Sequence, residues 1–301
     1  MSLAAHVATL GRGPGRSRSL TEDEATEAMR LMLEGAEPEA VGALLMLLRM
    51  KGETAEEIAG LARAAQAALP KLPGADLDWP CYAAGRTRGL PWFLLSARLL
   101  AAAGYRVVLH GWNGNDAAVR DHLVAAGPQV VYLPLEETHP ALFRLLALRP
   151  VLGLRSCVNT VCRMLNPSRA SASVQGVFHP SYRLLQADAA ARLGWRNLTV
   201  IKGGGGEFER LPGKCVEGFG LRDGAPFDGV FPVLTAPIRL AEVAPGVGLQ
   251  ALWDGTARNE TATEIVIGTA TLALDTLGVS DAEQVARGLW SDRHKAQETA
   301  A

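Results

Sequence analysis

The sequence predicts an α/β fold in two parts: a small N-terminal helical bundle domain and a larger α/β domain with a mostly parallel central sheet. Residues 21–69 carry apolar side chains at helical spacing and show no strand pattern. After Pro73, β-branched runs alternate with helical segments, which is typical of a parallel sheet. At 301 residues, with 48% hydrophobic and 20% charged residues, the chain is long enough for two domains.

The first seventy residues predict three short helices. Two capping boxes, Thr21 with Glu24 and Thr54 with Glu57, mark the starts of the first and third helices. Pro38 opens the second, at a position where its missing N–H costs nothing. The second helix is apolar on more than one face, so it either forms the middle of the bundle or meets another subunit. We expect a homodimer formed through the helical domain.

The remainder of the chain predicts alternating helices and strands. The expected elements are helix 91–103, strand 105–110, helix 116–126, strand 129–133, strand 174–179, helix 181–193, strand 197–202 and helices near 261–277 and 281–290. Two helical segments between 138 and 164 interrupt the alternation, and we expect them to pack on the N-terminal bundle. The expected domains are a helical domain of 1–72, joined in space by about 138–168, and an α/β ligand-binding domain of 73–137 and 169–301.

Residues 138–187 form a positively charged block in a chain whose formal net charge is only -1. The block contains no Asp or Glu, and its basic residues are Arg144, Arg149, Arg155, Arg163, Arg169, Arg183, His139 and His179. Guanidinium groups stay charged and bind phosphate or carboxylate in a bidentate fork, so the block suits an oxyanion ligand. The alternative is that each arginine lies singly on a solvated face.

The expected strand ends carry glycine, basic or polar residues at 82–86, 110–114, 178–180 and 202–207. Ligands of parallel sheets bind beyond these C-terminal ends. The glycine run 203–206 is either a phosphate-facing nest or a loose turn. His110 follows a strand, and it is either a ligand-binding residue or a buried structural histidine.

Other features narrow the class of protein. The cysteines Cys81, Cys157, Cys162 and Cys215 form no CxxC pair, so they indicate neither a disulfide framework nor a zinc site. No apolar run reaches the roughly 18 residues of a membrane span, and the N-terminus lacks a signal-peptide core. We therefore expect a cytoplasmic protein without a membrane partner.

Several spaced motifs occur in an order that resembles a known family. They are Leu33-Glu34-Gly35, Leu48 to Glu57, His139-Pro140-Ala141, Leu152-Gly153-Leu154-Arg155-Ser156, Asn159 leading to Leu165-Asn166-Pro167, and Gly176-Val177-Phe178-His179-Pro180. The chain resembles the anthranilate phosphoribosyltransferases of glycosyltransferase family 3, shared with pyrimidine nucleoside phosphorylases, over nearly its whole length. Gly11-Arg12-Gly13-Pro14 and the loop from Tyr82 to Arg86 also resemble a divergent branch, one bacterial member of which is thought to bind nucleic acid.

The chain departs from that family at three sites. The Gly-Thr-Gly-Gly-Asp loop that cradles the diphosphate in the family is replaced by Tyr82-Ala83-Ala84-Gly85-Arg86. The Lys-His-Gly-Asn segment becomes Leu109-His110-Gly111-Trp112-Asn113, which lacks the lysine. The Asp-Glu pair that holds magnesium aligns with Phe208-Glu209, with Glu207 nearby. Arg155 matches the arginine that the family directs at anthranilate, and Asn166 matches its helical-domain signature or is structural.

The candidate ligand- or phosphate-binding residues are Tyr82, Gly85, Arg86, His110, Gly111, Asn113, His139, Arg155, Asn166 and Lys202, with Glu207 and Glu209 as a weak Mg²⁺ site. Two functions remain. The first is a glycosyltransferase-family protein that binds a phosphorylated small molecule in a basic interdomain cleft, without anthranilate phosphoribosyltransferase activity. The second is a non-catalytic protein that binds nucleic acid in the same groove. The missing diphosphate loop counts against the first, and a pI near 6.6 counts against the second.

Overall fold

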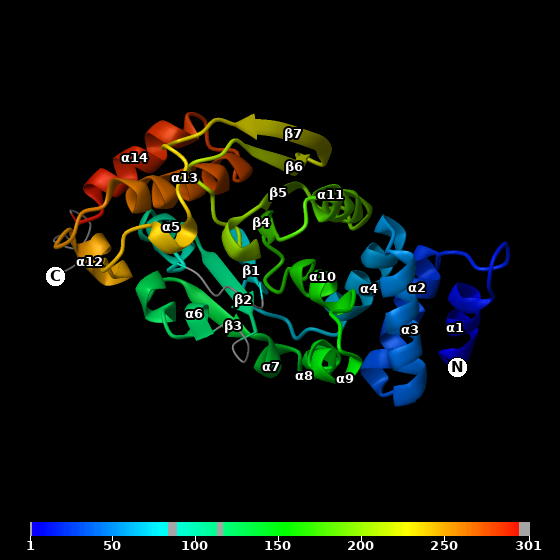
Figure 1. The fold of residues 1–301 in the computed structure, drawn as a ribbon. Helices are drawn as coiled ribbons and strands as arrows, with labels where there is room; N and C mark the ends of the chain where they lie inside the picture. The colour runs from blue at the N-terminus through cyan, green and yellow to red at the C-terminus, as the bar shows by residue number, and fades with distance from the viewer. Residues whose placement is uncertain (1, 84–88, 113–116, 295–301) are drawn as a thin grey trace.

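The computed structural model describes residues 2–83, 89–112 and 117–294, and it places a helical part at one end of the molecule beside an α/β part (Figure 1). The N-terminal helices are α1 (Ala4–Gly11), α2 (Glu22–Glu34), α3 (Pro38–Lys51) and α4 (Ala55–Ala67). The later short helices α7 (Leu135–Thr138), α8 (Pro140–Leu146), α9 (Arg149–Leu152) and α10 (Val158–Arg163) lie near them. In the described ranges, no helix is long and apolar enough to cross a membrane.

The α/β part is built on a seven-stranded sheet within the described residues, in the order β3-β2-β1-β4-β5-β6-β7. The strands are β1 (Leu77–Cys81), β2 (Val107–Gly111), β3 (Val131–Pro134), β4 (Ala172–Val177), β5 (Asn197–Lys202), β6 (Val216–Arg222) and β7 (Ala225–Phe231). Strands β1 to β5 pair in parallel, whereas β6 and β7 add an antiparallel hairpin at one edge. The predicted fold class is therefore confirmed, and the hairpin is an addition that the sequence pattern did not predict.

Helices cover both faces of the sheet. On one face lie α5 (Phe93–Ala102), α12 (Leu249–Asp254), α13 (Glu260–Thr276) and α14 (Ala282–Asp292), around a core in which Trp79 stacks on Phe93 at 6.0 Å. The other face is covered by α10 and α11 (Tyr182–Arg192), and its core continues into the N-terminal bundle. The expected helix at 116–126 forms only as α6 (Ala117–Arg120) and a 3-10 turn, Leu123–Ala126.

Local sequence signals explain the helical part. Both predicted capping boxes form, at Thr21 and at Thr54. Glu57 does more than cap α4, because its buried carboxylate also accepts the backbone N–H of Leu20 at 2.9 Å and pairs with Lys51 at 2.7 Å. Helix α8 packs on α2, and α10 packs on α4 and α8, so the segment after β3 completes the bundle.

The loop after β5 is pressed against the C-terminal ends of β4 and β5. A Cβ atom added at Gly176 would lie 2.0 Å from the carbonyl carbon of Glu207 and 2.3 Å from the nitrogen of Phe208. A Cβ atom at Gly203 would lie 1.6 Å from the Glu207 carbonyl oxygen. Both positions therefore need glycine so that the backbone of Glu207 can approach the sheet.

We expect Gly176→Ala to destabilise the protein by roughly 1–3 kcal/mol, because the added methyl group collides with backbone that cannot rotate away. The matched control is Gly288→Ala in α14, where a Cβ meets nothing within 4 Å. That change should stabilise the protein by about 0.5–1 kcal/mol through helix propensity. Urea unfolding measures both, and equal effects of the two substitutions would contradict the close approach.

Candidate functional site

A basic cleft lies beyond the C-terminal end of β4, where the helical part meets the sheet. It has a cavity of about 90 Å³ lined by Arg49, Arg155, Ser156, Asn159, Thr160, Arg163, Val177, Phe178, His179, Tyr182 and Gln186. A smaller neighbouring cavity shares Arg155, Ser156 and Asn159 and adds Trp112, Leu146 and Arg149. Among the described residues, neither cavity is lined by an Asp or a Glu, and we call the two together the basic cleft.

Three elements bring guanidinium groups into the basic cleft. Arg49 lies in the last turn of α3, Arg149 opens α9, and Arg155 lies in the loop that begins where Gly153, at φ 69°, ends α9. Burial lowers the pKa of Arg155, and the nearby positive charges of Arg149 and Arg49 lower it further. Arg155 is therefore repelled by Arg149 and by Arg49, and a bound oxyanion would relieve that repulsion.

Arg163 fixes the floor of the basic cleft. Its Nε donates to the Gly176 carbonyl of β4 at 3.0 Å, and its Nη1 donates to the Asn159 carbonyl at 3.1 Å and to the Asn159 side chain. The backbone carbonyl of Arg163 accepts from Gln175 Nε2 at 2.8 Å. Burial lowers the pKa of this guanidinium, and the carboxylate of Glu207 opposes that shift. Helix α10 is thereby fastened to β4.

His110 and Tyr82 lie in a buried polar network on the same face of the sheet. The Tyr82 hydroxyl lies 2.9 Å from His110 Nδ1, and Asp78 Oδ1 lies 3.1 Å from His110 Nε2. Ser173 Oγ donates to Asp78 at 2.8 Å. His110 is 1% exposed and lines neither cavity of the basic cleft, so this geometry supports the structural interpretation of the histidine. Burial raises the pKa of Tyr82 well above its usual value.

Glu207 and Glu209 hold backbone segments in place. Glu207 Oε1 accepts the N–H of Ala83 at 2.8 Å, and Glu209 Oε2 accepts the N–H of Phe93 at the start of α5 at 3.0 Å. Their exposed fractions are 1% and 0%. Mg²⁺ keeps several waters and dehydrates reluctantly, so two enclosed carboxylates engaged with backbone amides do not fit such a site. In the described ranges, no three His, Cys, Asp or Glu side chains gather to hold a metal ion.

The other predicted site residues lie apart from Arg155. His139 is buried against α4, with Nε2 3.0 Å from the Ala65 carbonyl oxygen, and burial lowers its pKa. Asn166 lies before the N-terminal end of β4, whereas Arg155 lines the cleft beyond the C-terminal end of that strand. Lys202 is exposed at the end of β5 and lines no part of the basic cleft.

Gly111 ends β2, where a Cβ atom would lie 2.4 Å from the Cys81 carbonyl oxygen, so the close pairing of β1 and β2 accounts for this glycine. The predicted residues Gly85, Arg86 and Asn113 lie outside the described residues.

Four residues that line the cleft are absent from the predicted site: Arg49, Asn159, His179 and Tyr182. Arg49, Asn159 and His179 belong to motifs that resemble the family, and His179 also belongs to the positively charged block of residues 138–187; these were the available signals. Arg49 lies far away in sequence, at the end of a helix whose pattern indicates only a packing or subunit surface. Arg49 reaches the cleft because α3 packs beside α9. A Cβ atom added at Gly42 of α3 would lie 3.8 Å from the side chain of Leu152 in α9.

The fold and the cleft define a class: a helical bundle joined to a mostly parallel α/β domain, with a basic cleft between them. Residues 7–68 match the family described as Glycosyl transferase family, helical bundle domain. The chain is 33% identical over 223 residues to anthranilate phosphoribosyltransferase of Thermus thermophilus, covering 66% of this chain and 67% of the relative. The same enzyme of Natronomonas pharaonis is 32% identical over 207 residues, or 62% of each chain.

The chain therefore belongs to glycosyl transferase family 3, the family of the anthranilate phosphoribosyltransferases. The match to the Natronomonas relative spans less than two thirds of that protein. Solved structures show the same fold along nearly the whole chain. The Thermus thermophilus enzyme superimposes with a TM-score of 0.80 at 23% identity, covering 97% of this chain and 94% of that one. A Saccharomyces cerevisiae enzyme described as in complex with PRPP and Mg gives a TM-score of 0.73 at 16% identity, with coverage of 98% and 94%.

Proposed function

We propose that this protein binds a phosphate-bearing small molecule in the basic cleft and acts as a glycosyltransferase on a substrate other than anthranilate. The observation that carries the proposal is the convergence of Arg49, Arg149 and Arg155 from three separate elements onto cavities without an acidic lining in the described residues. Guanidinium groups bind phosphate oxygens in a bidentate fork, which fixes orientation as well as charge.

The chemistry available to the cleft is electrostatic. In the transfer of a sugar from its phosphate or diphosphate, negative charge grows on the leaving oxygens while the sugar carbon becomes positive. Fixed guanidinium groups stabilise that developing charge without reorganising during the reaction. Arg155 and Arg49 line the cavity where the leaving phosphate would lie.

Two features support the loss of anthranilate phosphoribosyltransferase activity. The Gly-Thr-Gly-Gly-Asp loop of the family is replaced after β1 by Tyr82-Ala83-Ala84-Gly85-Arg86, so only one of the three glycines that let the backbone approach a diphosphate closely is left. The first amide after Tyr82, that of Ala83, already donates to Glu207. Since Glu207 and Glu209 do not fit a magnesium site, the proposed binding depends on the arginines and not on these carboxylates.

We expect this chain to fail to restore growth of a tryptophan auxotroph that lacks its own anthranilate phosphoribosyltransferase. The physical reason is the loss of the glycines that let backbone amides approach the diphosphate closely in the family loop. The Thermus thermophilus enzyme, expressed from the same vector, is the positive control. Growth supported by this chain at normal expression would show that the substituted loop still holds the donor substrate.

The exposed ring of Phe178 favours a second candidate function, a non-catalytic nucleic-acid-binding protein of the divergent branch. This ring is 60% exposed beside the cleft and lies edge-on to His179, with ring centroids 5.1 Å apart. Aromatic rings beside a basic groove bind single-stranded nucleic acid by stacking.

Titration with pyrophosphate, phosphoribosyl diphosphate and single-stranded DNA distinguishes the two functions. If the cleft binds a small phosphorylated molecule, Arg155→Ala should raise the dissociation constants of pyrophosphate and phosphoribosyl diphosphate by about tenfold or more, because a hydrogen bond to a charged group is lost. Arg144→Ala, which removes an exposed arginine outside the cleft, should change little. Tight DNA binding that falls steeply with salt, with no heat from either phosphate ligand, would favour the second function.

We also propose a homodimer formed through the helical domain. Met50 at the end of α3 and Val151 of the neighbouring α9 are 80% and 79% exposed, which is unusual for large apolar side chains. Light scattering of the purified protein measures the oligomeric state, and a monomer at micromolar concentration would contradict the proposal.

A further inference from the structure

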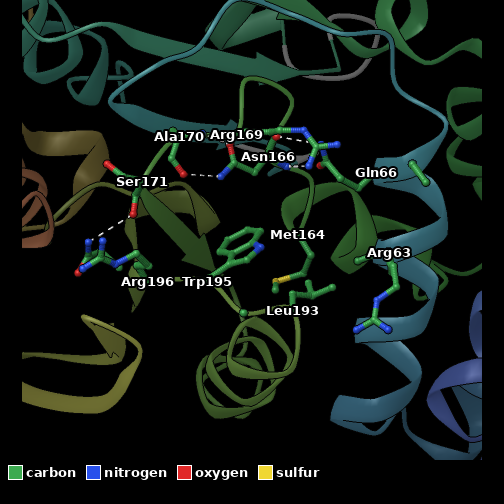
Figure 2. Close-up of a pocket in the computed structure, with 14 residues that line it drawn as sticks. Arg63, Gln66, Met164, Asn166, Arg169, Ala170, Ser171, Leu193, Trp195 and Arg196 are labelled. Atoms are coloured by element: carbon green, nitrogen blue, oxygen red, sulfur yellow. Dashed lines mark hydrogen bonds between the residues drawn. The ribbon is translucent and has the colours of Figure 1, made fainter.

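A second, larger cavity lies at the N-terminal ends of β4 and β5, whereas the basic cleft lies beyond the C-terminal end of β4. It has a volume of about 470 Å³ and lies between α4, the loop that leads into β4, and the turn between α11 and β5 (Figure 2). The lining residues that decide its chemistry are Arg63, Gln66, Asn166, Arg169, Trp195 and Arg196. Its volume is within the range of small-molecule sites. We call it the rear pocket.

The rear pocket is separate from the basic cleft. It opens before Ala172, the first residue of β4, whereas the cleft begins at Val177, the last. The strand of six residues between these two points spans roughly 16 Å, and the two cavities share no lining residue. The pocket is nevertheless built by both parts of the molecule, because α4 belongs to the bundle and α11 covers the sheet.

The lining of the rear pocket carries positive charge. Three arginines line it and, among the described residues, no carboxylate does. Arg63 forms an ion pair with Glu22, and Arg196 pairs at 2.7 Å with Asp223 where both side chains are at least 70% exposed. An exposed pair of this kind holds its partner weakly. In the described part of the chain, no carboxylate lies within ion-pair distance of Arg169.

Arg169 is held in a strained backbone conformation. Its φ of 51° is in the left-handed region that a residue with a side chain rarely adopts. Asn166 closes the loop around it, because its side chain donates to the Ala170 carbonyl and accepts the Ala170 N–H, each at 2.8 Å. Gln66 of α4 fastens the loop by exchanging hydrogen bonds with the Asn166 backbone at 3.0 and 2.8 Å. Glycine would adopt this φ without strain, so the arginine side chain indicates a use.

Trp195 provides an aromatic surface in the same pocket. Gly194, at φ 71°, ends α11, and the Trp195 N–H then returns to the Ala190 carbonyl at 3.0 Å. The indole is partly buried against the core of the helical part. Figure 2 shows it in the middle of the pocket, with Arg63 and Arg196 to either side and Arg169 beyond Asn166. A planar ring can stack on an indole while guanidinium groups hold an attached anion.

We propose that the rear pocket binds a nucleoside monophosphate, with the base against Trp195 and the phosphate held by Arg169. The side-chain amides of Gln66 and Asn197 hold the walls of the pocket in place through hydrogen bonds to the backbone of Asn166, Ser171 and Asp223. Because α4 and the α11 turn both line the pocket, the bound nucleotide contacts both parts of the molecule. The proposal is independent of the function assigned to the basic cleft.

Calorimetric titration with adenosine 5′-monophosphate, adenosine and inorganic phosphate tests this site. We expect the nucleotide to bind more tightly than either fragment, because only the nucleotide uses both the indole and the guanidinium. Arg169→Gly should weaken nucleotide binding by about tenfold while leaving urea stability equal or higher, since glycine relieves the strain at φ 51°. Trp195→Leu should remove the advantage of the nucleotide over inorganic phosphate.

Arg144→Ala, which removes an exposed arginine outside both the rear pocket and the basic cleft, is the matched control and should leave this binding unchanged. The proposal is overturned if the nucleotide binds no better than phosphate, or if Arg169→Gly binds it as tightly as the unmodified protein. It is also overturned if Arg155→Ala abolishes the binding, because the nucleotide would then lie in the basic cleft.

Discussion

The buried guanidinium of Arg163 holds the two parts of this protein together at the candidate site. Arg163 is only 6% exposed. Burying its charge costs several kcal/mol of desolvation free energy, unless hydrogen bonds and an opposite charge offset that cost. Here the compensation comes from the Gly176 carbonyl of β4, from Asn159 one turn earlier in α10, and from the nearby charge of Glu207. These partners come from α10, the sheet and the loop after β5, so the position of each depends on the others. The basic cleft exists because α10 is fixed in this place.

The arginines of the positively charged block, residues 138–187, lie at both ends of the parallel strands. The basic cleft at the C-terminal ends contains Arg149, Arg155, Arg163 and His179. Arg169 lies at the N-terminal ends, in the same pocket as Trp195. Arg183 belongs to neither group, because it pairs with Glu217 at 2.9 Å and stacks on Phe219. The position of the basic cleft agrees with the general rule that ligands of parallel sheets bind beyond the C-terminal ends of the strands. Nothing in that rule accounts for a strained arginine at the N-terminal edge.

The sequence predicted the fold class, both N-terminal capping boxes and the bounds of β5, because each depends on local periodicity or local hydrogen bonding. The β6–β7 hairpin escaped prediction because Gly218, Gly220 and Gly229 interrupt its strand pattern. For the candidate site, motif order selected Arg155, but chain spacing could not bring Arg49 to it. The enclosure of His110 by Asp78 and Tyr82 depends on strand pairing, which local pattern does not specify. The Gly85-Arg86 and Asn113 loops lie outside the described residues, so those assignments stay predictions.

We propose that guanidinium groups from α3, α9 and the loop before α10 together form one oxyanion site. A crystal structure of the protein soaked with pyrophosphate tests this claim most directly. We expect density for the anion in the basic cleft, within hydrogen-bonding distance of Arg155 and of at least one of Arg49 and Arg149. Pyrophosphate bound at another surface, with the basic cleft occupied only by water, would contradict it.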